Sequence, residues 1–209
     1  ESGCGPRTIA NWTTYCIARG RLMKKHKELE KDTIVRRWHY TEPVEPFCFP
    51  QQDIVFVCVG TDRSTGDSFG PLMGSALKKA GVPNVYGCIS EPVHAVNLER
   101  CLDLVSLKHP DALVVGVDAA LGKQQRVGML LLREAPLAPG TGVGKTLPLV
   151  GTYSITAIVN VGGFMEYVVL HSTRLAFVFA LVESLTTFLL ESLAYPISGV
   201  AVSQGVGDI

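Results

Sequence analysis

Short runs of apolar residues alternate with longer amphipathic stretches through most of the chain. The apolar runs, rich in β-branched residues, predict strands at residues 54–59, 84–90, 112–117, 127–132 and 153–161. The amphipathic stretches predict helices at residues 69–80 and 93–107, and the apolar stretch 164–193 predicts one or two more. Strands that are apolar throughout are typical of a sheet covered on both faces. The alternation therefore predicts an α/β fold, a three-layer α/β/α sandwich with a mostly parallel central sheet.

The first 52 residues follow a different pattern. Residues 8–31 are only loosely amphipathic and rich in lysine and arginine, which favours a solvated helix. Pro43, Pro46 and Pro50 then favour extended chain. We expect residues 1–52 to form an N-terminal helical arm with a proline-containing linker, and residues 53–209 to form a single domain.

The apolar stretch near the end of the chain is long enough to suggest a membrane span. Residues 175–193 contain Glu183 and Glu191, however, and Arg174 precedes them. A charge at mid-bilayer costs about 2.5–3.5 kcal/mol on insertion scales. We therefore expect a helix buried against the sheet and no membrane partner. The same apolar surface would suit a homo-oligomer interface as readily as an intrachain core.

Composition excludes several classes of function. The net charge is zero, with 19 basic and 19 acidic residues, so no nucleic-acid-binding surface is indicated. The six cysteines form no CxxC pair, and Cys58 and Cys88 lie in predicted buried strands. We interpret these features as a cytoplasmic protein in a reducing compartment, with neither a disulfide framework nor a zinc knuckle.

Two aspartates follow predicted buried strands. Asp67 ends the polar loop that follows the strand at 54–59, and Asp118 comes directly after the strand at 112–117. Open α/β sheets place their ligand sites at the carboxyl ends of strands. The alternatives are structural: Asp67 as a helix N-cap, Asp62 as a turn residue, and Asp118 as an acceptor of loop N–H groups.

Two carboxylates at one sheet edge would be chemically useful if their strands are neighbours. Close carboxylates cannot both ionise cheaply, so one pKa rises and the pair shares a proton. Such a pair can activate a water and protonate a leaving nitrogen, which is acid–base hydrolysis of an amide. Asp67 and Asp118 are therefore the candidate catalytic residues.

Other motifs give weaker signals. Residues 139–146, Pro-Gly-Thr-Gly-Val-Gly-Lys-Thr, resemble a phosphate-binding loop, but proline replaces the first glycine and the following residues are poor helix formers. The backbone of Gly140, Gly142 and Gly144 could instead approach a substrate. His94 and His171 are scattered candidates for a metal ligand beside the aspartates. We expect neither a metal nor a cofactor.

Three segments in order resemble the sporulation protein YyaC family. They are Val59-Gly-Thr-Asp-Arg-Ser-Thr-Gly-Asp-Ser-Phe-Gly-Pro71, Val117-Asp-Ala119 and Val159-Asn-Val-Gly-Gly-Phe-Met-Glu-Tyr167. That family is similar to the germination protease of endospore formers, which degrades small acid-soluble spore proteins. More distantly it resembles the hydrogenase maturation endopeptidases, whose phosphorylase/hydrolase-like sandwich is the fold expected here. The resemblance covers residues 54–193.

The resemblance implies roles for particular residues. Asp67 and Asp118 match the two catalytic candidates of the germination protease, while Asp62 and Arg63 match only the YyaC pattern and would position substrate. The loop around Gly140, Gly142 and Gly144 resembles the protease's own glycine loop. The implied protein is an aspartate-dependent endopeptidase acting on a peptide or protein in the cytoplasm of a spore or forespore. The alternatives are a non-catalytic sporulation factor that binds a partner, and a metal-dependent maturation peptidase.

Overall fold

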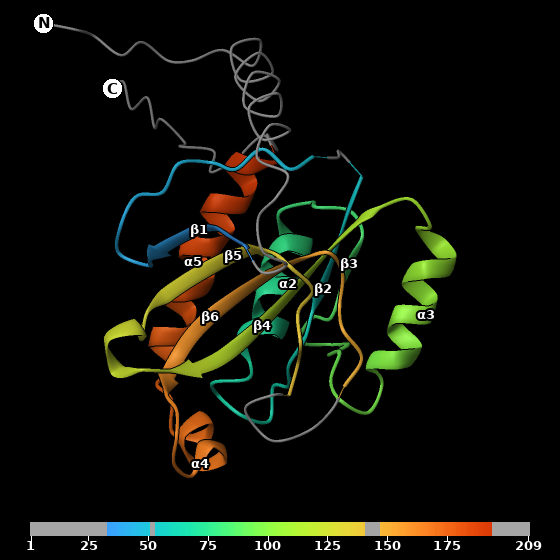
Figure 1. Ribbon diagram of the computed structural model, residues 1–209. Helices are drawn as coiled ribbons and strands as arrows, with labels where there is room; N and C mark the ends of the chain where they lie inside the picture. The colour runs from blue at the N-terminus through green and yellow to red at the C-terminus, as the bar shows by residue number, and fades with distance from the viewer. Residues whose placement is uncertain (1–32, 51–52, 141–146, 194–209) are drawn as a thin grey trace, which may run out of the picture.

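The computed structural model describes residues 33–50, 53–140 and 147–193 as a mixed sheet between helices (Figure 1). The six strands are β1 (Thr33–His39), β2 (Ile54–Cys58), β3 (Val85–Tyr86), β4 (Leu113–Gly122), β5 (Met129–Glu134) and β6 (Tyr153–Val161). The helices are α2 (Phe69–Lys79), α3 (Leu98–Lys108), α4 (Glu166–His171) and α5 (Leu175–Ser192), with a short 3₁₀ turn η1 (Gln124–Arg126).

The sheet order is β1-β5-β6-β4-β2-β3. β3, β2, β4 and β6 pair in parallel, whereas β5 is antiparallel to both of its neighbours, β1 and β6. Helices α2 and α5 cover one face of the sheet and α3 covers part of the other (Figure 1). The predicted three-layer sandwich with a mostly parallel central sheet is therefore confirmed.

The larger core lies between the sheet and the helix pair α2 and α5. Phe56, Phe69, Leu132, Ile155 and Phe188 are all essentially inaccessible there. The smaller core lies under α3, where Val55 and Val57 of β2 meet Leu98 and Val105. β2 is buried on both faces, as its unbroken apolar run predicts.

Helix α5 fills the larger core. It is the one described helix long and apolar enough to cross a membrane by length and composition. Its buried side chains nevertheless face the sheet and α2, while Glu183 and Glu191 are exposed. This arrangement matches the expected helix with its glutamates on the solvent side.

Strand β1 was not indicated by the apolar pattern. It lies within the segment assigned to the arm and linker, yet it pairs along its length with β5. Trp38 is 3% exposed, packs against Phe188 with ring centroids 4.6 Å apart, and donates a hydrogen bond to Ser184 Oγ. Residues 33–39 therefore complete the sheet and its core, whereas the expected helix at 8–31 lies outside the described residues.

Several predicted boundaries are corrected by the structure. The strand expected at residues 84–90 is only β3, because Gly87 turns the chain with φ +84°. The helix expected from residue 93 begins at Leu98, since Val93 instead forms a bridge to Val59. β4 does not end at Val117 but continues to Gly122 alongside the long β6, so Asp118 lies within the strand.

The expectation of no disulfide is also corrected. Cys48 is disulfide-bonded. Cys58, Cys88 and Cys101 are free thiols, and the first two are buried as predicted. Burial raises the pKa of the Cys58 thiol above its ordinary range, so it behaves as a small apolar side chain.

Candidate active site

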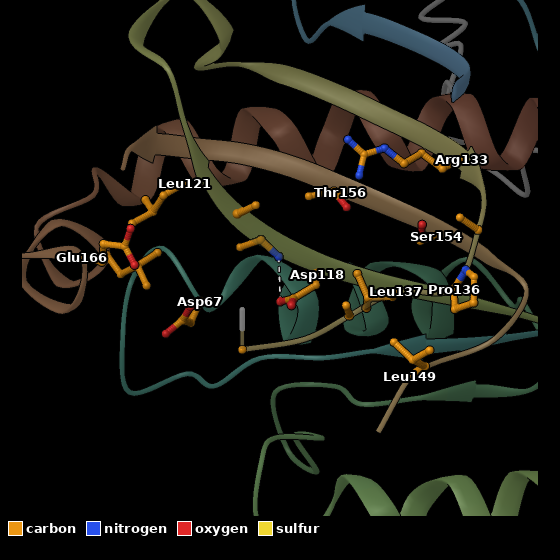
Figure 2. Close-up of a pocket in the computed structure, with 16 residues that line it drawn as sticks. Asp67, Asp118, Leu121, Arg133, Pro136, Leu137, Leu149, Ser154, Thr156 and Glu166 are labelled. Atoms are coloured by element: carbon orange, nitrogen blue, oxygen red, sulfur yellow. Dashed lines mark hydrogen bonds between the residues drawn. The ribbon is translucent and has the colours of Figure 1, made fainter. Parts of the chain in front are cut away.

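A pocket lies over the part of the sheet that α3 leaves uncovered. It is a cavity of about 490 Å³ on the face formed by β4, β6 and β5. The segment after β5 closes one side, where Leu137 and Val150 pair and Leu137 lies against Gly116. The loop before α2 and the helix α4 close the other. Both Asp67 and Asp118 line this cavity (Figure 2).

The loop that carries Asp67 is held by close backbone contacts. Gly60 has φ +146°, and a Cβ there would collide with the backbone oxygen of Asp67. The Thr61 N–H donates to that same oxygen at 3.2 Å. On the other side, the Gly66 N–H donates to the Leu170 carbonyl of α4 at 2.9 Å, with no room for a side chain on Gly66. These contacts fix Asp67 between β2 and α4.

Asp67 does not act as the helix cap that its position suggested. The N-cap residue of α2 is Ser68, and no side chain makes a capping hydrogen bond there. The Ser68 hydroxyl instead donates to the Thr65 carbonyl at 2.7 Å. The Asp67 carboxylate is therefore free of a capping role and lines the pocket.

Asp118 reaches the pocket from the middle of the sheet. It pairs with Thr156 of β6, and its Oδ1 accepts the Ala119 N–H at 2.8 Å (Figure 2). Oδ1 is thus committed to the backbone, which leaves Oδ2 as the oxygen available for a proton. The structural role that the sequence offered as an alternative for Asp118, acceptance of local N–H groups, is therefore filled by Oδ1 alone.

The pKa of Asp118 lies well above its ordinary value. Burial of the carboxyl group is the main cause, although the residue keeps some access through the pocket. The Ala119 N–H opposes the rise, and the negative charge of Asp67 adds to it. Asp67 and Asp118 thus lie in one cavity, where the charge of the first disfavours ionisation of the second.

The pKa of Asp67 is also raised, but less strongly. Burial raises it, while the Ser64 hydroxyl and the charge of His171 lower it. The buried Ser64 hydroxyl lies close enough to Asp67 to favour its ionised carboxylate. Within the described part of the chain, however, the Ser64 Oγ makes no hydrogen bond that satisfies the usual distance and angle limits. As pH rises, Asp67 therefore ionises before Asp118.

Figure 2 shows how the two carboxyl groups are directed. Asp118 extends from β4 toward the side on which Asp67 lies, whereas the Asp67 carboxylate is turned away from Asp118 in this view. Glu166 of α4 lies beyond Asp67, and Arg133 of β5 lies on the opposite side of Asp118. The pocket thus has an acidic end and a basic end.

Of the five residues predicted to bind substrate, the structure describes three and places only one of these in the pocket lining. Gly140 lines the pocket with φ +74°. Asp62 and Arg63 are exposed in the turn after Gly60, and neither side chain belongs to the pocket lining. Gly142 and Gly144 lie outside the described residues. The proposed roles of all five stay predictions.

The structure does not support a phosphate-binding loop at residues 139–146, because such a loop must lead directly into a helix. No helix begins at Leu147, and Val150 instead pairs with Leu137 in extended chain. His94 is used locally, since its Nδ1 accepts the Val96 N–H at 3.3 Å. Across residues 33–50, 53–140 and 147–193, no group of three His, Cys, Asp or Glu side chains is placed to hold a metal ion.

The sequence pattern did not reveal four polar residues in the pocket: Arg133, Ser154, Thr156 and Glu166. Arg133 and Ser154 pair across β5 and β6, and Asp118 pairs with Thr156, so three strands contribute neighbouring polar groups to one face. The signal was present as polar residues at alternate positions of 153–161. Their meeting with Arg133 depends on strand register, which the sequence does not specify.

The fold and the pocket define an α/β/α protein with two aspartates in one pocket, Asp118 on the sheet and Asp67 in the loop before α2. The model of a family described as "Protein of unknown function (DUF1256)" matches residues 30–187, and the chain belongs to this family. Over 124 residues the chain is 52% identical to "Uncharacterized protein YyaC" of Bacillus subtilis (strain 168). This match covers 58% of the chain and 60% of the Bacillus protein. The YyaC part of the sequence resemblance is thereby confirmed.

Proposed function

We propose that this protein is an endopeptidase-like hydrolase that cleaves peptide bonds with Asp67 and Asp118. One observation carries the proposal. Two carboxyl groups from separate elements line one cavity, and the buried one has a pKa raised further by the charge of the other. The pKa of Asp118 is therefore raised more than that of Asp67. Two neighbouring carboxyl groups with different pKa values can work together, one as a base and the other as an acid.

The roles follow from the order of ionisation. Asp67, which ionises first, would accept a proton from a water as the water oxygen attacks the carbonyl carbon of the peptide bond. Protonated Asp118, through Oδ2, would give its proton to the leaving nitrogen as the C–N bond breaks. Transfer of the proton from Asp67 back to Asp118, directly or through water, would restore the starting state.

The class of substrate comes from the resemblance described above. A polypeptide, with small acid-soluble spore proteins as first candidates, would lie across the open face of the pocket in the cytoplasm of a sporulating cell. Gly140 lines the pocket, and its backbone would approach such a chain.

Mass spectrometry of cleavage products tests the proposal. The purified chain is incubated with unstructured spore-protein peptides, and new N-termini are identified. The wild-type chain should produce defined new termini, whereas the Asp67→Asn/Asp118→Asn double variant should produce none. If the wild-type chain binds these peptides but leaves them intact, the non-catalytic alternative replaces the proposal.

A further inference from the structure

Arg133 is a charged pocket residue that the proposed chemistry does not use. It lies near the end of β5, where alternate residues Leu130 and Leu132 are buried in the larger core. Its own side chain therefore faces the opposite side of the sheet and lines the cavity. Figure 2 shows the guanidinium extending over β6 toward Thr156.

The guanidinium carries a charge without a protein partner. Among the described residues it makes no hydrogen bond or ion pair, and Asp118 draws no stabilisation from it. A cation paired with Asp118 would lower the pKa of that carboxyl group, and Arg133 is not among the groups that shift this pKa. The two groups therefore do not neutralise each other, and Arg133 keeps its five N–H donors for another molecule.

Neutral hydroxyl groups surround this donor. Ser154 pairs directly with Arg133 across the sheet and is 3% exposed, and Thr156 follows two residues along β6. Both line the cavity beside the guanidinium. A planar donor flanked by hydroxyl groups matches the geometry of a carboxylate, which an arginine can bind through two parallel hydrogen bonds.

We propose that Arg133, with Ser154 and Thr156 beside it, forms a subsite for a carboxylate of the bound peptide. The identity of the ligand as a peptide rests on the proposed function, but the subsite itself requires no turnover. The carboxylate is either an acidic side chain or the terminal carboxylate of the chain. A phosphate, with its larger negative charge, is disfavoured more than a carboxylate by the acidic side chains of Asp67 and Glu166 in the same cavity.

Strand geometry sets the distance between this subsite and the acid pair. Arg133 pairs with Ser154, Ser154 pairs with Gly116, and Asp118 lies two residues further along β4. Standard strand spacing then places the Cα atoms of Arg133 and Asp118 about 12 Å apart. An extended peptide covers that distance in about three residues, and the Arg133 side chain reaches toward Thr156, so the bound carboxylate lies within about three residues of the peptide bond at Asp118.

Binding of three matched peptides tests the subsite. All are fluorescein-labelled ten-residue peptides of glycine, serine and alanine with one variable central residue. The first has a central glutamate and an amidated C-terminus, and the neutral peptide has a central glutamine and an amidated C-terminus. The third has a central glutamine and a free C-terminal carboxylate. Fluorescence anisotropy is measured in the Asp67→Asn/Asp118→Asn background, so that no peptide is cleaved. At least one carboxylate peptide should bind about tenfold more tightly than the neutral peptide.

Variants assign that preference to Arg133. Arg133→Met should abolish the preference for a carboxylate peptide over the neutral peptide, and Arg133→Lys should retain only part of it. Arg126→Met is the control: it removes an exposed arginine outside the pocket and should leave the preference unchanged. Equal binding of all three peptides, or a preference that survives Arg133→Met, would overturn the proposal. Stronger competition by inorganic phosphate than by the glutamate peptide would overturn the choice of a carboxylate.

The two proposals fail separately. Intact peptides in the cleavage experiment, together with Arg133-dependent binding here, would remove the hydrolase and keep the subsite. Cleavage by the wild-type chain, without any effect of Arg133→Met on binding, would keep the hydrolase and remove the subsite. Unfolding in urea should be similar for Arg133→Met and its parent, because the guanidinium makes no hydrogen bond or ion pair within the described residues.

Discussion

Asp118→Asn should lower kcat/KM for peptide cleavage by about 10²–10⁴-fold, the range that positioned acid–base groups contribute. The asparagine keeps the shape of the side chain and can accept the Ala119 N–H, so the local structure should survive. It cannot deliver the proton that the leaving nitrogen needs. Steady-state kinetics on any peptide cleaved by the wild-type chain measures the loss.

The pH dependence of the wild-type protein separates the two roles. Cleavage requires ionised Asp67 and protonated Asp118. The rate should therefore fall as pH drops through the pKa of Asp67, and fall again as pH rises through the higher pKa of Asp118. Asp67→Asn should also lose activity, because no base then activates the water.

An exposed aspartate provides the matched control. Asp103 lies on the solvent side of α3, away from the pocket, so Asp103→Asn should leave both the rate and its pH profile unchanged. Wild-type rates in folded Asp118→Asn, with the pH profile intact, would rule out Asp118 as the acid. A loss of equal size in Asp103→Asn would mean that the effect is not specific to the pocket.

Gly60→Ala should lower the free energy of unfolding by about 3 kcal/mol or more and should abolish cleavage. Two causes add: the left-handed backbone at φ +146° disfavours any side chain, and the new Cβ would collide with the Asp67 carbonyl oxygen. The loop can relieve the collision only by moving Asp67 away from its place in the pocket. Urea unfolding and the cleavage assay measure the two losses.

Gly81→Ala separates the two causes. Gly81 also has a positive φ, +80°, but a Cβ there meets nothing within 4 Å. This variant should cost only the backbone penalty, about 1 kcal/mol, and should retain activity. If Gly60→Ala were no more destabilising than Gly81→Ala, the tight packing of Gly60 against Asp67 would be wrong.

Much of the fold could be predicted because its central strands are buried on both faces. β6 was predicted to the residue and β2 to within one residue, both from runs rich in apolar and β-branched residues. α2 was predicted to within one residue from its amphipathic pattern. β1 was missed because Arg36 and Arg37 interrupt its apolar pattern. The burial of Trp38 depends on Phe188 and Ser184 of α5, contacts about 150 positions away that local pattern cannot reveal.

The candidate site was predictable only in part. Asp67 and Asp118 could be found because Asp118 directly follows one buried apolar run and Asp67 ends the loop after another, and the structure brings both into one cavity. Asp118 proved to lie within β4, since the length of a strand depends on its pairing with β6 rather than on its own residues. Arg133 joins the pocket through the antiparallel register of β5, which is set by tertiary pairing.

The most direct test of the account is the titration of Asp118 by carboxyl carbon NMR, with the signal assigned by its absence in Asp118→Asn. We expect a pKa well above the ordinary aspartate value in the wild-type chain. In Asp67→Asn it should fall, because the neighbouring charge is gone, but stay raised, because burial is the larger cause. An ordinary pKa, or one that does not change in Asp67→Asn, would contradict the coupled acid pair on which the proposed hydrolysis depends.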